Sequence, residues 1–279
     1  MIRLSGFADE ISPDLDLQIR TLRAEYMRYL ELRAVWETNV LDLTEAQRRE
    51  VKDRLGDSGM GVSSIGSPIG KVPIDAPWAD HVERFKHCLD VAEFFEAPYI
   101  RLFSYYPPEG GRIADHRDEV LRRLNEQVQM AEGRPVTLLH ENEKKIFGES
   151  GEACADLAEN VPGLGLIFDS ANLVQVGIRP MEAWQQMKDH VVYFHIKDAV
   201  FPTGEIAPPG EGDGDIPEIL ADAINGRGYE GFVSLEPHLA AAGEFSGFSG
   251  PEPFKKAVRL VKGMLEGLGA AYDATRPEV

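Results

Sequence analysis

Short apolar segments alternate with longer amphipathic stretches along the chain. Eight of the apolar segments are rich in β-branched and aromatic residues, which is typical of strands that are covered on both faces. They are RLSGFA (3–8), YMRYLELR (26–33), GVSSIG (61–66), YIRLFSYY (99–106), VTLLHE (136–141), LGLIFDSA (164–171), VVYFHIKD (191–198) and GFVSLEPH (231–238).

The stretches between these segments have one charged face and predict helices, most clearly over residues 14–25, 44–58, 78–95, 115–132 and 252–268. Two helix starts show capping chemistry: Ser12 places a hydroxyl before Pro13, and Thr44 with Gln47 fits a capping box. Eight strand–helix units in succession predict an α/β fold, a single (β/α)8 TIM barrel. The alternative is a doubly wound open sheet, which often carries an early GxGxxG or GxxxxGK(S/T) loop, and the chain has neither.

The length of 279 residues and the hydrophobic content of 43% suit one large core. We expect the barrel to occupy residues 1–270 and a short C-terminal tail to occupy residues 271–279. No apolar run approaches the ~18 residues of a membrane-spanning helix. The N-terminus enters a strand segment at once, unlike a signal peptide. Cys88 and Cys154 form no CxxC pair, so the sequence predicts a cytoplasmic protein with two reduced thiols.

The formal net charge of −18 argues against nucleic acid as a partner, because phosphate binding relies on Lys and Arg side chains. It places no such limit on a small neutral substrate. No segment marks an interface, and a homo-oligomer stays open, with a dimer as the commonest closed form.

Four successive strand segments each carry a strong metal ligand where the apolar run ends: Glu141, Asp169, His195 and Glu236. The carboxyl ends of all strands in a parallel barrel open onto one face, so these side chains should converge there. Any one of them alone is more often a helix cap, a surface charge or a core histidine. Their joint pattern predicts a metal site.

Three carboxylates and one imidazole suit one hard or borderline divalent ion. We expect Mn²⁺ first, with Mg²⁺, Co²⁺, Fe²⁺ or Zn²⁺ as alternatives. Such an ion would polarise a sugar carbonyl and acidify the adjacent C–H group.

Side chains two residues apart on a strand share a face, which adds candidates for substrate contact. Lys197 follows His195 by two residues, and His238 follows Glu236 by two. Lys197 would either contact substrate oxygens or pair with a neighbouring carboxylate.

Four further residues lie in or near loops at the same face. Trp36 could stack on a sugar ring or anchor its loop. Glu211, in the glycine-rich segment 208–215, could touch the substrate from a flexible loop or shield His195. Glu31 and Arg33 share a face near the end of the second strand segment, where an internal ion pair between them is the favoured interpretation.

Five motifs together resemble the xylose-isomerase-like TIM-barrel superfamily, in its sugar phosphate isomerase/epimerase branch: LLHENEK (138–144), FDSANLVQVG (168–177), FHIKDA (194–199), PPGEGDGDI (208–216) and SLEPHL (234–239). The resemblance covers essentially the whole chain. It implies that Glu141, Asp169, His195 and Glu236 bind the metal as in ketose 3-epimerases. It also implies that Glu141 and Glu236 act as acid and base on opposite faces of the sugar, through a metal-bound cis-enediolate.

Two positions depart from the ketose 3-epimerases within that resemblance. Asn172 stands where they often have a His, and Phe201 stands where they carry an Arg. Both positions help to hold the ketose in that family, which makes Asn172 a candidate substrate contact. The departures leave open a metal-dependent dehydratase or other lyase acting on a keto-inositol or keto-glycoside.

The first expectation is therefore a metal-dependent isomerase or epimerase of a small keto-sugar or its phosphate, with a small carbohydrate as its partner. An endonuclease-IV-like barrel would need further His ligands on the first four strand segments, which contain none. A non-catalytic binding barrel is disfavoured because three converging carboxylates are costly to bury without a cation.

Overall fold

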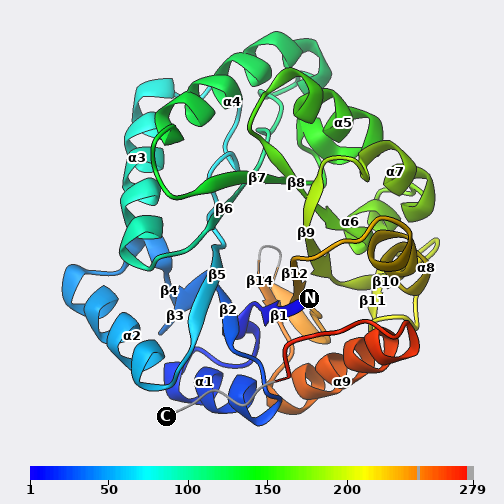
Figure 1. Ribbon diagram of the computed structural model, residues 1–279. Helices are drawn as coiled ribbons and strands as arrows, with labels where there is room; N and C mark the ends of the chain where they lie inside the picture. Colours follow the sequence, from blue (N-terminus) through cyan, green and yellow to red (C-terminus); the bar gives the residue numbers. More distant parts are fainter. Residues whose placement is uncertain (244–245, 275–279) are drawn as a thin grey trace.

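Eight parallel strands form a nearly closed barrel with helices around it (Figure 1), which confirms the predicted (β/α)8 TIM barrel. The structure, a computed structural model, describes residues 1–243 and 246–274. The barrel strands are β1 (Arg3–Gly6), β2 (Tyr29–Leu32), β5 (Gly61–Ile65), β6 (Tyr99–Leu102), β7 (Thr137–Glu141), β8 (Gly165–Asp169), β9 (Val191–Ile196) and β12 (Phe232–Leu235).

The barrel strands follow one another in chain order, and β12 pairs with β1. One seam remains, between β1 and β2. There Phe7, directly after β1, forms a parallel bridge with Glu31 of β2. Glu31 therefore lies where the barrel closes.

Helices ring the strands on the outside of the barrel (Figure 1). They are α1 (Leu15–Ala24), α2 (Glu45–Asp57), α3 (Trp78–Phe94), α4 (Arg117–Ala131), α5 (Gly151–Asn160), α6 (Ser170–Gln175), α7 (Pro180–Met187), α8 (Ile216–Ala221) and α9 (Pro251–Gly267). Short helical turns are η1 (Ala8–Glu10), η2 (Val40–Asp42), η3 (Ile113–His116), η4 (Phe147–Glu149) and the π-helical η5 (Asp222–Gly226).

The two predicted helix starts have different outcomes. The capping box of Thr44 and Gln47 at α2 is confirmed. The start assigned to Ser12 and Pro13 is wrong, because α1 begins at Leu15 with Asp14 as its cap. A carboxylate is as good an N-cap as a hydroxyl, and Asp14 Oδ1 accepts from the Leu17 amide at 2.8 Å.

Three short antiparallel hairpins follow barrel strands and were not predicted: β3 (Ala34–Val35) with β4 (Thr38–Asn39), β10 (Asp198–Val200) with β11 (Glu205–Ala207), and β13 (Ala240–Gly243) with β14 (Ser246–Phe248). Their strands are too short for an alternating pattern to be visible in the sequence.

An inner cluster of apolar and aromatic side chains occupies the barrel interior. Its members are Leu139, Ile167, Tyr193 and Phe232, with Tyr29 and Tyr99 packed against them. Glu141, Asp169 and His195 each lie two residues beyond a member of this inner cluster. Strand alternation therefore turns these three side chains to the same inward side, one layer nearer the carboxyl ends.

The C-terminal segment returns to the start of the chain. The amide of Ile2 donates to the carbonyl of Ala271 at 2.9 Å, and the amide of Asp273 donates to the carbonyl of Ile2 at 2.9 Å. Residues 275–279 of the predicted tail lie outside the described residues. Cys88 and Cys154 are free, buried thiols. Within the described ranges, no helix has the length and hydropathy needed to cross a bilayer.

We expect Thr44→Ala to lower the free energy of unfolding by about 1 kcal/mol, because the start of α2 loses its capping hydroxyl. Urea denaturation measures this directly. Thr44→Ser keeps the hydroxyl and should retain most of the stability. Equal midpoints for wild type and Thr44→Ala would contradict the capping role.

Candidate metal centre

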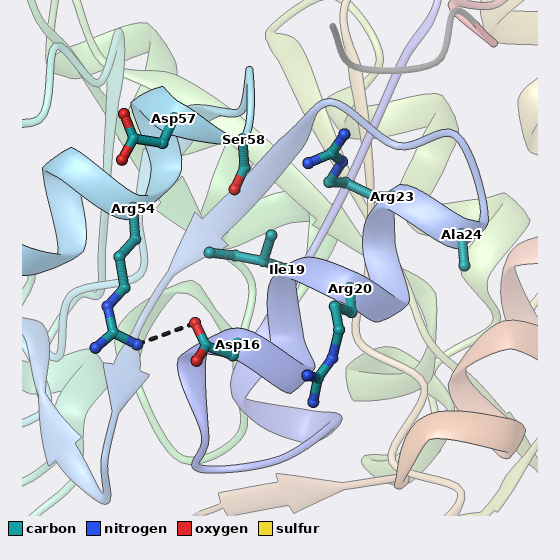
Figure 2. A pocket seen from close by; sticks show the side chains of 8 residues that line it. All are labelled: Asp16, Ile19, Arg20, Arg23, Ala24, Arg54, Asp57 and Ser58. Carbon is teal, nitrogen blue, oxygen red and sulfur yellow. Dashed lines mark hydrogen bonds and ion pairs between the residues drawn. The ribbon is translucent and has the colours of Figure 1, made fainter. Parts of the chain in front are cut away.

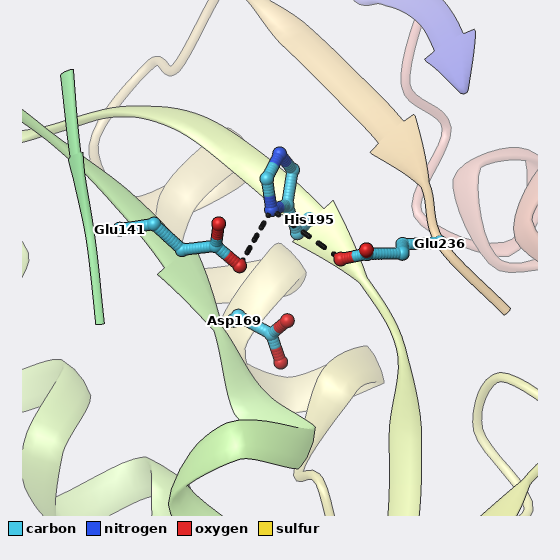
Figure 3. Close-up of side chains that lie close together, drawn as sticks. All are labelled: Glu141, Asp169, His195 and Glu236. Carbon is cyan, nitrogen blue, oxygen red and sulfur yellow. Dashed lines mark ion pairs between the residues drawn. The ribbon is translucent and has the colours of Figure 1, made fainter. Parts of the chain in front are cut away.

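The four predicted ligands lie together in the barrel mouth (Figure 3). One ligand atom from each lies within 4.8 Å of the ligand atoms of the other three. The side chains are almost fully buried, with relative exposures of 1% for Glu141, 0% for Asp169, 1% for His195 and 4% for Glu236.

Strand register explains this convergence. Glu141 and Asp169 are the last residues of β7 and β8, and His195 lies near the end of β9. Asp169 pairs directly with His195 across the parallel ladder. Glu236 directly follows β12, and its amide donates to the carbonyl of Ile196 at 3.1 Å. The four side chains thus come from the carboxyl ends of four neighbouring strands.

The imidazole of His195 is oriented by Glu31. Its Nε2 lies 3.0 Å from Glu31 Oε2, an oxygen that also accepts from Tyr193 at 3.1 Å and from Ser234 at 2.9 Å. Nδ1 is buried and makes no hydrogen bond of good geometry with any residue in the described ranges. It lies 3.1 Å from Glu141 Oε1 and 3.8 Å from Glu236 Oε2. Nδ1 is therefore the nitrogen that faces the carboxylates.

The protonation of His195 follows from these neighbours. Burial alone would lower the pKa of His195, but the carboxylates of Glu31 and Glu141 raise this pKa to about 10. A divalent ion would have to replace the proton on Nδ1.

Glu141 is held by one residue of a neighbouring strand and one of a helix. Arg101 of β6 lies 3.1 Å from Glu141 Oε2, and the side-chain amide of Asn172, in α6, donates to Glu141 Oε1 at 3.4 Å. Burial would raise the pKa of Glu141, but His195 and Arg101 bring it below its usual range. Asn172, predicted to contact substrate, therefore contacts a predicted ligand, and its role toward substrate stays a prediction.

Asp169 has both a structural and an electrostatic partner. Its Oδ1 caps α6 by accepting from the amide of Asn172 at 3.0 Å. Its backbone is fixed by Asn142, whose side chain exchanges hydrogen bonds of 2.9 and 2.8 Å with the Asp169 amide and carbonyl. Lys197 Nζ lies 2.8 Å from Oδ2. Burial raises the pKa of Asp169, and Lys197 offsets this only in part.

Glu236 is surrounded by three cationic or titratable groups. Arg33 Nη1 lies 2.7 Å from Oε1, His238 Nε2 lies 3.2 Å from the same oxygen, and Lys197 Nζ lies 3.6 Å from Oε2. Burial would raise the pKa of Glu236, but Lys197, His238 and Arg33 hold it well below its usual range. His238 also lies 3.2 Å from Glu10 Oε1 of η1.

The donor set fits a divalent ion. Three carboxylates and one imidazole nitrogen are typical ligands of Mn²⁺, Mg²⁺ and related ions. Among the described residues, two buried atoms in this set have charged neighbours without hydrogen-bond geometry, namely His195 Nδ1 at 3.1 Å from Glu141 and Asp169 Oδ2 at 2.8 Å from Lys197. A bound cation would satisfy both atoms as ligands.

Sequence reasoning assigned Glu31 and Arg33 to each other, and that assignment is wrong. Glu31 contacts His195, whereas Arg33 pairs with Asp9 and Glu236, each at 2.7 Å. Alternation correctly gives the shared face, but it does not show which residue of another strand lies opposite. The contact of Glu10 with His238 was missed, because a helical turn after β1 brings that carboxylate inward.

Two other predicted substrate contacts lie elsewhere on the loops. The amide of Trp36 donates to the carbonyl of Pro13 at 2.7 Å, and the Trp36 ring lies 5.9 Å from the guanidinium of Arg54. Glu211 is about half exposed and lies 3.7 Å from Lys256 of α9. Their proposed roles toward substrate stay predictions.

A separate cavity of about 520 Å³ lies between α1 and α2 on the outside of the barrel (Figure 2). Its wall is Asp16, Ile19, Arg20, Arg23, Ala24, Arg54, Asp57 and Ser58. Arg54 and Asp16 form an ion pair of 3.0 Å across it. The cavity contains none of the four predicted ligands.

Comparison with known proteins agrees with this architecture. The family model described as xylose isomerase-like TIM barrel matches residues 24–264. None of the curated proteins compared matches the chain significantly.

Solved structures resemble the whole barrel. A D-tagatose 3-epimerase-like protein has a TM-score of 0.77 and 15% identity, covering 96% of this chain and 98% of its own. The probable 3-DHS dehydratase AsbF, involved in petrobactin synthesis, from Bacillus anthracis has a TM-score of 0.69 and 18% identity, covering 93% and 98%. A xylose isomerase-like TIM barrel protein from Mycobacterium smegmatis, in complex with magnesium, has a TM-score of 0.70 and 17% identity, covering 96% and 97%. At these identities the likeness is one of fold.

We expect binding of a divalent ion to release a proton from His195, because the raised pKa of about 10 keeps its imidazole protonated at neutral pH. The apparent affinity for Mg²⁺ should therefore fall as the pH falls, by up to about tenfold per pH unit. Calorimetric titration in buffers of different ionisation enthalpy measures the proton count. Binding that is independent of both pH and buffer would contradict this assignment.

Proposed function

The chain belongs to the xylose isomerase-like TIM-barrel family, and from that premise we propose that it is a divalent-metal-dependent isomerase or epimerase of a small keto-sugar or sugar phosphate. The observation that carries the proposal is the placement of Glu141 and Glu236 on opposite sides of His195 (Figure 3). Two carboxylates in such positions can serve the two faces of one substrate carbon.

Glu141, Asp169, His195 and Glu236 would hold the ion. When bound, the ion supplies Lewis-acid polarisation of a substrate carbonyl and makes the neighbouring C–H more acidic. We favour Mn²⁺ among the ions that suit this donor set.

The acid–base work falls to the two glutamates. One, as the carboxylate, removes the proton from the carbon next to the carbonyl, leaving an enediolate, and the other, in its protonated form, returns a proton from the opposite face. Both carboxyl groups have a pKa below the usual range, so the glutamate that returns the proton must first take one up from solvent. Three carboxylates around a 2+ ion leave an excess negative charge, which lets one of them hold the transferred proton.

Surrounding residues would orient the substrate and the ligands. Asn172, Lys197 and His238 each contact at least one of the four ligands. Trp36 and Glu211 are proposed to contact the substrate from the loops. We expect the protein to act in the cytoplasm, where Cys88 and Cys154 stay reduced.

A dehydratase or other lyase acting on a keto-inositol or keto-glycoside is the second candidate. Such a reaction also begins with removal of a proton next to a carbonyl. The observation that favours it is Phe201, which packs against Ala171, Val174 and Ala199. This position therefore offers no cation to a ketose, unlike the Arg of the ketose 3-epimerases that the sequence resembles.

The first prediction is one divalent ion per chain in the purified protein, and loss of that ion in Asp169→Ala. Elemental mass spectrometry measures both. A protein that binds no ion after reconstitution with Mn²⁺, Mg²⁺, Co²⁺ or Zn²⁺ would leave a non-catalytic barrel as the better interpretation.

The second prediction is that Glu236→Gln slows exchange of the substrate's carbon-bound proton with solvent deuterium by at least about 100-fold, because general acid–base groups contribute that much. A screen of keto-sugars with Mn²⁺, followed by NMR and mass spectrometry, identifies the substrate. A product that differs in mass from the substrate only by incorporated deuterium supports the isomerase, and loss of water supports the lyase. Glu205→Gln, at an exposed position on β11, is the matched control. Full exchange activity in Glu236→Gln would refute the role of Glu236.

A further inference from the structure

The ammonium group of Lys197 lies beside two carboxylates that a bound ion would also contact. It lies 2.8 Å from Asp169 Oδ2 and 3.6 Å from Glu236 Oε2. Asp169 and Glu236 are two of the four proposed ligands. The side chain of Lys197 is only 4% exposed, so water screens its charge little.

Lys197 and Asp169 are held together by charge: the ammonium group is at ion-pair distance from the buried Oδ2, although the pair lacks hydrogen-bond geometry. A divalent ion on the four ligands would compete with the ammonium group for this oxygen. A divalent ion on the four ligands would lie next to the ammonium group, and like charges at that range in a buried site repel strongly.

A lysine side chain can change its position within such a site more readily than an arginine side chain. Its ammonium group is a compact charge on a flexible stem of four carbons, and it needs no fixed planar geometry. A further acidic group lies in reach of its electrostatic influence, namely Glu143, two residues beyond Glu141. Glu143 is paired with Lys71 at 2.9 Å, and its side chain is 14% exposed.

From these contacts we infer that Lys197 is an exchangeable counter-ion of the metal centre. Its ammonium group neutralises Asp169 and Glu236 before a divalent ion binds, and it moves away from both carboxylates when the ion takes its place. This inference rests on the proposed function, because it requires the four ligands to bind an ion. It gives Lys197 a role before catalysis: to keep the buried carboxylates in position.

The test compares the affinity of wild type and Lys197→Met for Mg²⁺ after chelator treatment, by calorimetric titration. Lys197→Met removes the competing charge and should tighten Mg²⁺ binding by at least about tenfold, as a variant lacking a paired cation leaves the carboxylates uncompensated. The chelated variant should also unfold at a lower temperature than chelated wild type and gain more from Mg²⁺. A merely structural lysine would lower the melting temperature without tightening Mg²⁺ binding.

Two variants serve as controls. Lys197→Arg keeps the charge and should show no tightening. Lys71→Met removes a lysine that pairs with Glu143 and with none of the four ligands, so its Mg²⁺ affinity should stay within about twofold of wild type.

Each outcome has one meaning. Unchanged or weaker Mg²⁺ binding by Lys197→Met, with tight binding by wild type, overturns the exchange and leaves the proposed function intact. Failure of wild type to bind any divalent ion overturns both.

Should Lys197→Met not fold, nitrogen-15 spectra of the lysine ammonium groups in wild type answer the same question. The signal that Lys197→Arg removes should shift or broaden when Mg²⁺ is added. A signal unmoved at saturating Mg²⁺ overturns the exchange.

Discussion

The burial of like charges is the constraint on which the rest of this structure depends. Three carboxylates and an imidazole have ligand atoms within 4.8 Å of one another, in a place with little water to screen them. Each carboxylate has an Arg or Lys partner from β6 or from the segments directly after β2 and β9. The site is thus a network of charges from several parts of the barrel. The same ion pairs determine the stability of the site and the cation affinity that we propose.

The closure of the barrel and the orientation of its histidine involve the same residue. The backbone of Glu31 forms a β-bridge with Phe7 at the seam between β1 and β2, and its carboxylate is hydrogen-bonded to Nε2 of His195. Tyr193 and Ser234 donate to the same oxygen. A change at this position would therefore disturb the orientation of the His195 ring together with the packing of the seam between β1 and β2.

The barrel and the convergence of Glu141, Asp169, His195 and Glu236 could be predicted because both depend on period-two alternation and on the common direction of parallel strands. The partners of those residues could not. Arg33 and Glu31 share a face, yet each pairs with a residue far away in sequence, because pairing depends on strand order and register. The three short hairpins were missed for another reason, since strands of two to four residues leave no periodic signal.

The inner cluster of Leu139, Ile167, Tyr193 and Phe232, with the rings of Tyr29 and Tyr99, fills the barrel beneath the proposed ligands. Anything that reaches His195 must then arrive by the mouth and leave by the same way. Under the proposed function, an ion on the four ligands would lie deeper in the barrel than a sugar that enters by the mouth. We therefore expect ordered binding, with the ion first and the sugar second, so that a bound sugar would block the path by which the ion leaves.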